Sequence, residues 1–341
     1  MSPTSEPSTQ ESNIDWSHFK TMIDAAESIL LISHVRPDGD AIGSQVALHR
    51  ALAVYGKRVF SINSNPLPPN LLFLDEDHVL GDLQNLSDDL RREMENVDLI
   101  VCLDTSSWAQ LGQMSDVIRA SHAAKLVIDH HAKGDDIGAV RFVDSHAEAA
   151  GALVVKAIEA LGLQLEYRYA FPIFVALATD TGWFRFSSVT AETCRTAAML
   201  IDAGVRPDDV YRILYEQETL GRIRLVGAAL AKTEPFLNGR LMFTSLLLDD
   251  FNRAGALASE SEDIVNMTLT VAGTELAVIM VEQSTGGYKL SFRSRCDLDC
   301  SQVAATFGGG GHRKAAGAFI DLPYEEARQK VLQAMGVEFP A

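Results

Sequence analysis

The stretch that decides the fold is Ile29-Leu-Leu-Ile32-Ser-His34-Val-Arg-Pro-Asp38-Gly-Asp40. Its apolar first part predicts a buried parallel strand, and the polar residues after it form the loop at the carboxyl end of that strand. In open α/β sheets, ligands bind at this end of the strands. One imidazole and two carboxylates suit a divalent metal such as Mn²⁺, Mg²⁺ or Zn²⁺. Because one loop cannot complete a coordination shell, further ligands are expected elsewhere in the chain.

Apolar segments alternate with helical patterns through the first half of the chain. This alternation predicts an α/β fold, a mostly parallel, doubly wound sheet with helices on both faces. Further strands are predicted at residues 59–62, 98–103 and 125–128, and helices at residues 15–28, 41–54, 149–161 and around 174–178. Residues 15–195 are therefore predicted to form one α/β domain. The leader at residues 1–14 is rich in Ser, Thr, Pro and Glu and is expected to be disordered.

The pattern changes near residue 236, which predicts a second, smaller α+β domain over residues 236–335. Residues 196–235 are helical in pattern, with a break at 204–207, and are expected to link the two domains. Strands are predicted at residues 241–248, 275–282 and 289–295, and the last two are joined by a hairpin turn at 284–287. A short helix at 301–307 leads into a glycine-rich segment.

The composition limits the function. The 341-residue chain carries a net charge of −17, which argues against binding long double-stranded nucleic acid but not against a short phosphorylated substrate. No apolar run approaches the roughly 20 residues that span a bilayer, so no membrane partner is expected. The four cysteines are expected to be free thiols in a reducing cytoplasm. A structural zinc at Cys296 and Cys300 is disfavoured, because no second pair of ligands accompanies them.

Four polar loops follow apolar segments of the first domain. If the strands are parallel, these loops meet at one edge of the sheet. They supply enough imidazoles and carboxylates for two metal ions about 3.5–4 Å apart, the common arrangement for phosphate ester hydrolysis. An Asp at a strand end is often only a helix cap, but capping does not explain the accompanying histidines. The loops contain His34, Asp38 and Asp40; Asp104; Asp129, His130 and His131; and Asp180.

These loops also carry a family resemblance. The string Val127-Ile-Asp129-His130-His131 resembles the signature of the DHH phosphoesterase superfamily, to which RecJ-like proteins belong. The first loop, Asp104-Thr-Ser and Thr179-Asp180-Thr-Gly182 match that family's other motifs in order. The segment from Phe307 to Gly317 resembles the glycine-rich motif of the associated C-terminal domain. The chain is most similar to the bifunctional oligoribonucleases and phosphoadenosine-phosphate phosphatases, also called nano-RNases.

The resemblance implies roles for the polar loops. Asp104 would bridge two ions and so take part in catalysis, while His131 would face the substrate phosphate as donor or general acid. Asp129 would orient a histidine from the second shell of the site. Mn²⁺ is the implied metal, although the ligand set also permits Mg²⁺, Co²⁺ or Zn²⁺. The remaining metal ligands would be His34 and Asp38 for one ion, and Asp40, His130 and Asp180 for the other.

The glycine-rich segment is expected to contact substrate. Successive glycines let backbone N–H groups approach an anion, and arginine suits phosphate recognition. Strand alternation places Arg295 on the same face as Arg293, but its role stays open, as does that of Arg185. Trp183 and Phe184 could stack on a base, but packing in the core is the favoured interpretation. The expected substrate contacts are Arg293, Gly309, Gly310, Gly311 and His312.

One position departs from the family pattern. Gln110 stands before Leu111-Gly112, where the family often has an arginine, so a phosphate contact from that position is in doubt.

The resemblance implies a two-metal phosphoesterase. It would hydrolyse short oligoribonucleotides to mononucleotides and 3′-phosphoadenosine 5′-phosphate to AMP, with the metals in the first domain and the substrate held by the second. One alternative is a hydrolase of linear or cyclic dinucleotides, or of pyrophosphate. Another is a nucleotide-binding regulator without catalysis. The expected partners are short RNA and phosphorylated nucleotides, and the oligomeric state is left open, a homodimer included.

Overall fold

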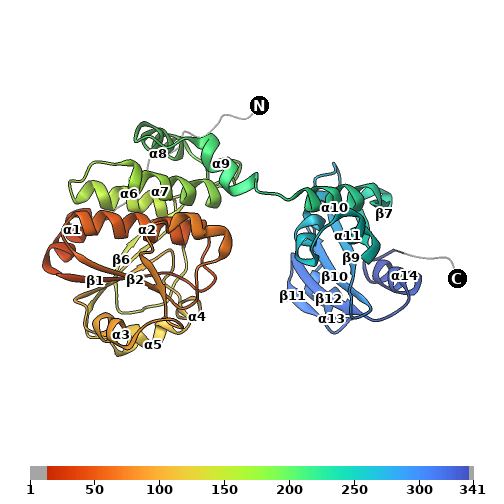
Figure 1. Cartoon of the computed structure of the whole chain (residues 1–341), viewed down its shortest axis with the longest axis horizontal. Helices are drawn as coiled ribbons and strands as arrows, with labels where there is room; N and C mark the ends of the chain where they lie inside the picture. Colours follow the sequence, from red (N-terminus) through yellow and green to blue (C-terminus); the bar gives the residue numbers. More distant parts are fainter. Residues whose placement is uncertain (1–13, 338–341) are drawn as a thin grey trace. The chain divides into compact units, whose positions relative to one another are not determined.

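The structure is a computed structural model and describes residues 14–337. The chain divides into two compact units, Met1–Leu214 and Tyr215–Ala341, which are described separately (Figure 1). The leader expected at residues 1–14 lies outside the described residues except for Ile14, which packs against the core of the first unit.

The first unit contains a six-stranded parallel sheet in the order β3-β2-β1-β4-β5-β6. The order runs outward in opposite directions from β1 and β4, and ligands bind at such a switch point. The expected doubly wound fold is therefore confirmed. The strands are β1 (Ser28–Ile32), β2 (Arg58–Asn63), β3 (Leu80–Asp82), β4 (Leu99–Leu103), β5 (Ala124–Asp129) and β6 (Val140–Val143).

The strands β3 and β6 were missing from the predicted set. Both are short edge strands, and apart from the buried Phe142 of β6 their residues are exposed or half-buried. Neither strand contains the continuous apolar run that marks a central strand. The strand predicted at 98–103 is consequently the fourth in the chain rather than the third, and the one predicted at 125–128 is the fifth.

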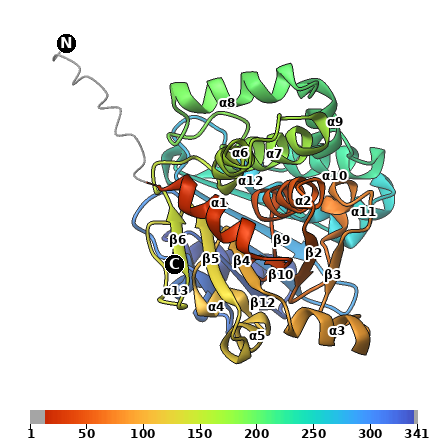
Figure 2. The same ribbon diagram turned by 90° about the vertical axis from the view of Figure 1, so that its left-hand side faces the viewer.

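Helices cover both faces of this sheet, because alternate residues of each central strand point to opposite sides. Ile29 and Leu31 of β1 join one core, and Leu30 and Ile32 join the other. Figures 1 and 2 show the two helical layers. The first layer contains α1 (Trp16–Ala25), α2 (Gly39–Val54), α6 (Ala150–Ala160) and α7 (Tyr167–Asp180), with η1 (Pro69–Leu74) beside α2; the second contains α3 (Asp88–Glu95), α4 (Trp108–Leu111) and α5 (Met114–Ala120).

No helix in the described part of the chain is long and apolar enough to span a bilayer.

Glycines let α2, α6 and α7 approach one another at backbone contact. A Cβ on Gly43 of α2 would lie 2.3 Å from the Pro172 carbonyl oxygen of α7. A Cβ on Gly151 of α6 would lie 2.7 Å from the Ala176 Cβ of α7. This close packing brings together the first turns of α2 and α6 and the last turn of α7, which carry polar residues at the carboxyl edge of the sheet.

The helical segment predicted at residues 196–235 overlaps three helices, and the first break between them falls at the predicted residues 204–207. Gly204 has a φ of +103° and separates α8 (Ala191–Asp202) from α9 (Pro207–Tyr215). Leu200 of α8 and Val210 of α9 belong to the core of the first unit, whereas Leu225 of α10 (Leu220–Ala231) belongs to a core of the second unit.

The second unit is an α+β domain, as expected, built on a mixed sheet in the order β11-β12-β10-β9-β8-β7. The β8 and β9 strands are parallel, and the other neighbours are antiparallel. The predicted set did not include α11, α12 and α14. The strands are β7 (Glu234–Phe236), β8 (Leu241–Leu246), β9 (Leu276–Glu282), β10 (Tyr288–Ser294), β11 (Gly310–His312) and β12 (Ala315–Ile320).

Each face of this second sheet also has a helical core, and the helices of the two cores come from different parts of the chain. On one face pack α10, α11 (Leu248–Ala254) and α12 (Ile264–Thr268). On the other pack α13 (Cys300–Ala305) and α14 (Tyr324–Ala334). The short turns η2 (Leu237–Gly239) and η3 (Ala258–Ser261) complete the unit.

We predict that Gly43→Ala lowers the melting temperature of the first unit. The added methyl group would collide with the Pro172 carbonyl oxygen and force α2 and α7 apart. Such overpacking costs about 1–3 kcal/mol, which exceeds the gain of about 1 kcal/mol from replacing glycine in a helix. The control is Gly227→Ala in α10, where nothing lies within 4 Å of the new Cβ. Calorimetry that finds Gly43→Ala as stable as the control would contradict this packing argument.

Candidate metal centre

The loop after β1 presents its polar side chains through local hydrogen bonds. Asp38 caps α2, with Oδ1 accepting from the backbone N–H groups of Asp40 (3.0 Å) and Ala41 (3.1 Å). The His34 Nδ1 donates to the Val35 carbonyl oxygen at 3.0 Å, which directs Nε2 away from the backbone. That Nε2 lies 3.9 Å from the Asp38 Oδ1. The imidazole is thus oriented to use Nε2 as a metal ligand.

Asp40 is buried and caps α6, whose first residue, Ala150, lies 110 residues further along the chain. Its Oδ2 accepts from the Ala150 N–H (2.7 Å), and its Oδ1 accepts from the Gly151 N–H (2.9 Å) and the Ser44 hydroxyl (3.1 Å). The Ala149 side chain cannot cap α6, so Asp40 supplies the missing acceptor. Burial and the nearby Asp104 carboxylate nevertheless raise the pKa of Asp40 well above its usual range. A cation at this position would offset that cost.

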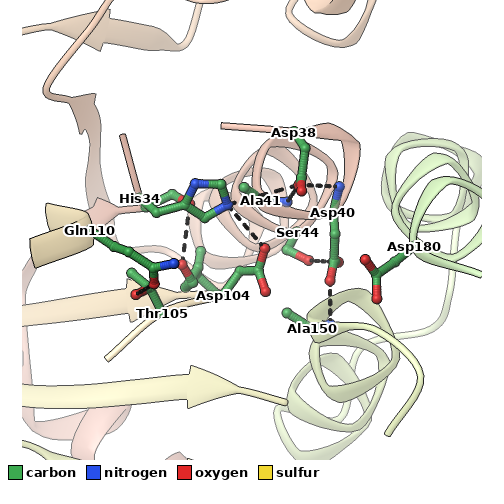
Figure 3. A network of polar contacts seen from close by, with 12 residues as sticks. His34, Asp38, Asp40, Ala41, Ser44, Asp104, Thr105, Gln110, Ala150 and Asp180 are labelled. Atoms are coloured by element: carbon green, nitrogen blue, oxygen red, sulfur yellow. Dashed lines mark hydrogen bonds and ion pairs between the residues drawn. The ribbon is translucent and has the colours of Figure 1, made fainter. Parts of the chain in front are cut away.

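Asp104 follows β4, and its carboxylate faces His34 (Figure 3). Its Oδ2 is 3.3 Å from the His34 Nε2, and its Oδ1 is 3.4 Å from the His130 Nε2. Oδ1 is buried and has no hydrogen-bond partner in the described part of the chain. Burial raises the pKa of Asp104, but the two imidazoles outweigh it and leave the pKa below its usual value. The backbone φ of +59° indicates local strain, which is found at functional sites.

His130 follows β5 and faces three carboxylates. Its Nδ1 contacts the Ala147 carbonyl oxygen at 3.2 Å, which leaves Nε2 for the cluster. Nε2 lies 3.4 Å from Asp104, 3.6 Å from Asp40 and 3.7 Å from Asp180. Burial lowers the pKa of His130, but the nearby carboxylates of Asp104, Asp40 and Asp180 raise it to about 9. The imidazole therefore compensates part of the negative charge that a metal would neutralise.

His131 contacts Asp129 through Nδ1, and this nitrogen also lies 3.6 Å from the Asp104 Oδ1. The Asp129 Oδ1 accepts from the His131 Nδ1 at 2.8 Å and from its backbone N–H at 3.0 Å. Asp129 is completely buried and also accepts from the Ser106 hydroxyl at 3.2 Å. The hydrogen bond from the His131 Nδ1 to Asp129 raises the pKa of His131. The His131 side chain is half exposed. Nε2 is therefore the nitrogen left to face a substrate.

The ligand atoms form three overlapping groups, each with its atoms within 4.8 Å of one another. Around an ion with bonds of about 2.1 Å, neighbouring octahedral ligands lie about 3 Å apart, close to the separations seen here. The unpartnered Asp104 oxygen and the excess of carboxylates over histidines also fit cations at this site. The groups are His34, Asp38 and Asp104; Asp40, His130 and Asp180; and Asp104, His130 and His131.

The predicted substrate residues come together on one face of the second sheet. Arg293 of β10 pairs with Ala315 of β12, and Ala315 pairs with His312 of β11. Directly paired residues share a face, so Arg293 and His312 flank the small side chain of Ala315. The Arg293 Nε donates to the Asn266 Oδ1 at 2.9 Å, which fixes the guanidinium at the edge of this row.

The surroundings of the glycines in the glycine-rich segment differ from one position to the next. A Cβ on Gly309 would lie 2.2 Å from the Gly317 carbonyl oxygen, and one on Gly311 would lie 2.6 Å from the Ala316 Cα. A Cβ on Gly310 would have nothing within 4 Å. The fold therefore requires glycine at 309 and 311, whereas at 310 the space outside the chain is open to a ligand.

The structure also places the residues whose roles were open. Trp183 and Phe184 pack against the core of the first unit, where both contact Phe174, as the favoured interpretation expected. Arg295 donates from Nη1 to the Leu269 carbonyl oxygen at 2.8 Å and anchors the end of α12. The Gln110 Oε1 accepts from the Thr105 hydroxyl at 2.7 Å.

Sequence reasoning missed the groups that hold the predicted ligands. Ser44 and the first turn of α6 bind Asp40, Ser106 binds Asp129, and the Ala147 carbonyl oxygen orients His130. Backbone groups carry no sequence signal. Only Ser106, which lies in the Asp104-Thr-Ser motif, was within a recognised pattern.

Comparisons with known proteins agree with the geometry. Residues 28–179 match the model of the DHH family, N-terminal domain, and residues 241–337 match the DHHA1 domain. A bifunctional oligoribonuclease and PAP phosphatase NrnA from Thermus thermophilus is 32% identical, over 91% of this chain and 90% of that protein. The corresponding Bacillus subtilis protein is 29% identical, over 86% and 90%.

A solved structure extends the similarity to the whole chain. An exopolyphosphatase-related protein from Bacteroides fragilis has a TM-score of 0.78 and 28% identity, and the match covers 96% of this chain and 97% of that one. The order of motifs, the two matched domains and the near full-length relatives agree with one another. The chain therefore belongs to the DHH family and carries both its N-terminal domain and the associated DHHA1 domain.

Proposed function

We propose that this chain is a two-metal phosphoesterase that hydrolyses short oligoribonucleotides to mononucleotides and 3′-phosphoadenosine 5′-phosphate to AMP. The observation that carries the proposal is the buried Asp104 carboxylate, whose two oxygens face two separate histidines. The substrate class rests on the relatives named as oligoribonucleases and PAP phosphatases, which the chain matches over most of its length.

In this proposal the carboxylate of Asp104 would be a ligand of both ions. The distances support His34 and Asp38 as the other ligands of one ion. For the second ion the ligands are Asp40, His130 and Asp180. The family resemblance implies Mn²⁺, and the mixed imidazole and carboxylate ligands also permit Mg²⁺, Co²⁺ and Zn²⁺.

The residues of the chain prepare the site for hydrolysis. When bound, a pair of divalent ions supplies a clamp on the phosphoryl oxygens and an acidified water. Asp129 holds the His131 ring so that Nε2 can donate a proton or hydrogen bond to the phosphate or to the leaving oxygen. The α6 N-terminus and Ser44 keep Asp40 in place while charge develops on the substrate.

The second unit supplies the substrate face. The open space at Gly310 admits backbone approach by a nucleotide, and His312 and Arg293 provide polar contacts on either side of Ala315. This arrangement supports recognition of a nucleotide more than of pyrophosphate, because a small inorganic ion does not need an extended face.

We also propose that the enzyme works in the cytoplasm on small substrates. All four cysteines are free, which suits a reducing compartment. The net charge of −17 opposes binding of long duplexes but leaves short RNA and phosphorylated nucleotides as the proposed partners.

We predict that Asp104→Asn lowers kcat/KM on a short oligoribonucleotide by on the order of 1,000-fold, because the bridging charge is lost. Metal-dependent stabilisation should fall as well: Mn²⁺ raises the melting temperature of the wild-type chain more than that of the variant. The matched control is Asp116→Asn on the exposed surface of α5, which leaves both properties unchanged. Unchanged hydrolysis by Asp104→Asn would refute the two-metal proposal and favour a regulator without catalysis.

We predict that the Mn²⁺-loaded chain degrades 5′-labelled RNAs of a few nucleotides faster than longer ones, and that chelation of the metal stops the reaction. Phosphoadenosine phosphate should release phosphate in the same preparation. The measurement compares initial rates over RNAs of graded length, cyclic and linear dinucleotides, and pyrophosphate. Turnover of pyrophosphate alone would refute the proposed substrate class.

We predict that Gly310→Ala leaves stability unchanged and raises KM for short RNA several-fold, because the methyl group occupies space that the fold leaves open. Gly309→Ala serves as the structural contrast and should destabilise the second unit, since its Cβ would collide with the backbone of β12. If Gly310→Ala binds and cleaves RNA as the wild type does, this position does not contact substrate.

A further inference from the structure

The turn that follows Asp180 has an unusual backbone. Gly182, Trp183 and Phe184 are three successive residues with φ of +55°, +59° and +60°. Residues with a Cβ rarely adopt this left-handed conformation, and two large aromatic residues in succession indicate strain held by the surrounding structure. Strained turns of this kind are concentrated at functional sites.

Thr181 holds this turn together. Its side chain is completely buried and donates to the Leu177 carbonyl oxygen at 2.6 Å. The same hydroxyl accepts from the Phe184 N–H at 3.0 Å. The backbone carbonyl oxygen of Thr181 accepts from the N–H groups of Arg185 (3.0 Å) and Phe186 (3.1 Å). The position of residues 185 and 186 is therefore fixed relative to the end of α7.

The turn sends its aromatic side chains in opposite directions. Trp183 and Phe184 pack inward against the core, while Phe186 keeps 55% of its surface exposed. The outer edge of the Phe186 ring occupies the place where a Cβ of Gly182 would be, 2.3 Å from the ring Cζ. A single exposed phenylalanine is ordinary on a protein surface. Here, however, a strained backbone and a glycine hold the ring in one position.

Arg185 belongs to the same turn and is held by a hydrogen bond to its backbone. Its Nε donates to the Gly182 carbonyl oxygen at 2.7 Å, which fixes the base of the guanidinium. Within residues 14–337, no carboxylate oxygen lies within ion-pair distance of this group. Such an arginine is prepared to receive an anion, and its fork geometry matches a phosphate.

The element lies next to the candidate metal centre. The Phe186 ring packs against Gly182, which is two residues from Asp180 in the sequence. The Asp180 carboxylate is 3.7 Å from the His130 Nε2. A substrate phosphate at the metals would bring its own nucleoside near this turn. An exposed ring stacks on any base, and an arginine beside it neutralises phosphate.

We propose that Arg185 and Phe186 form a nucleotide-binding element of the first unit, in which Phe186 stacks on a base of the oligoribonucleotide and Arg185 binds one of its phosphates. The inference rests on the proposed function and adds a base contact on the metal-binding unit itself. It assigns a role to two residues that the metal centre and the core leave unused.

The test measures steady-state hydrolysis by the Mn²⁺-loaded full chain on 5′-phosphorylated diadenylate and on two analogues, each lacking one adenine. Phe186→Leu should raise KM for diadenylate about 10-fold with kcat little changed, as expected for loss of one stacked base. On the analogue that lacks the stacked adenine, wild type and Phe186→Leu should have equal KM values. Phe186→Tyr should retain the wild-type KM, because it keeps the ring.

The controls separate binding from folding. Tyr167→Leu removes an equally exposed ring (54%) at the opposite end of α7 and should change no kinetic constant. Arg185→Gln should raise KM equally on all three substrates, because its partner is phosphate rather than a base. An unchanged KM for Phe186→Leu, or an equal rise on all three substrates, would overturn the stacking role, and an unchanged KM for Arg185→Gln would overturn the phosphate role. If the wild type cleaves none of the three, the proposed function itself fails and the inference fails with it.

Discussion

The buried carboxylate of Asp104 is the group on which the rest of the first unit depends. It lies at the switch point between β1 and β4, where a parallel sheet collects the ends of its strands. Two imidazoles approach it from opposite sides, yet Oδ1 keeps no hydrogen-bond partner in the described part of the chain. A polar atom buried in this way is costly unless a cation satisfies it. The close contact of α2 and α7 at Gly43 then places two more carboxylates beside it.

The ligands are held in place by groups that do not themselves bind metal. His34 and His130 each use Nδ1 on a backbone carbonyl oxygen, which leaves Nε2 for the cluster. Asp40 is fixed by the first turn of α6, and Asp129 holds the His131 ring through Nδ1. The candidate ligands are therefore positioned by hydrogen bonds of the fold itself, which reduces the reorganisation needed during hydrolysis.

Much of this could be predicted from sequence because it depends on local patterns. The apolar runs predicted the central strands, and the polar loops after them supplied the candidate ligands. The edge strands β3 and β6 could not be predicted, since neither short strand contains such a run. The capping of α6 by Asp40 joins residues 110 apart and leaves no local signal. Likewise, the different reasons for Gly309 and Gly310 become visible only when the neighbouring strand is in place.

The central claim is that two ions share the Asp104 carboxylate. Titration of the metal-free chain with Mn²⁺, followed by electron paramagnetic resonance, tests it most directly. The account predicts two ions per chain with magnetic coupling between them, as expected for a separation of about 3.5–4 Å through one bridging group, and loss of that coupling in Asp104→Asn. A single bound ion, or two ions without coupling in the wild-type chain, would contradict the account.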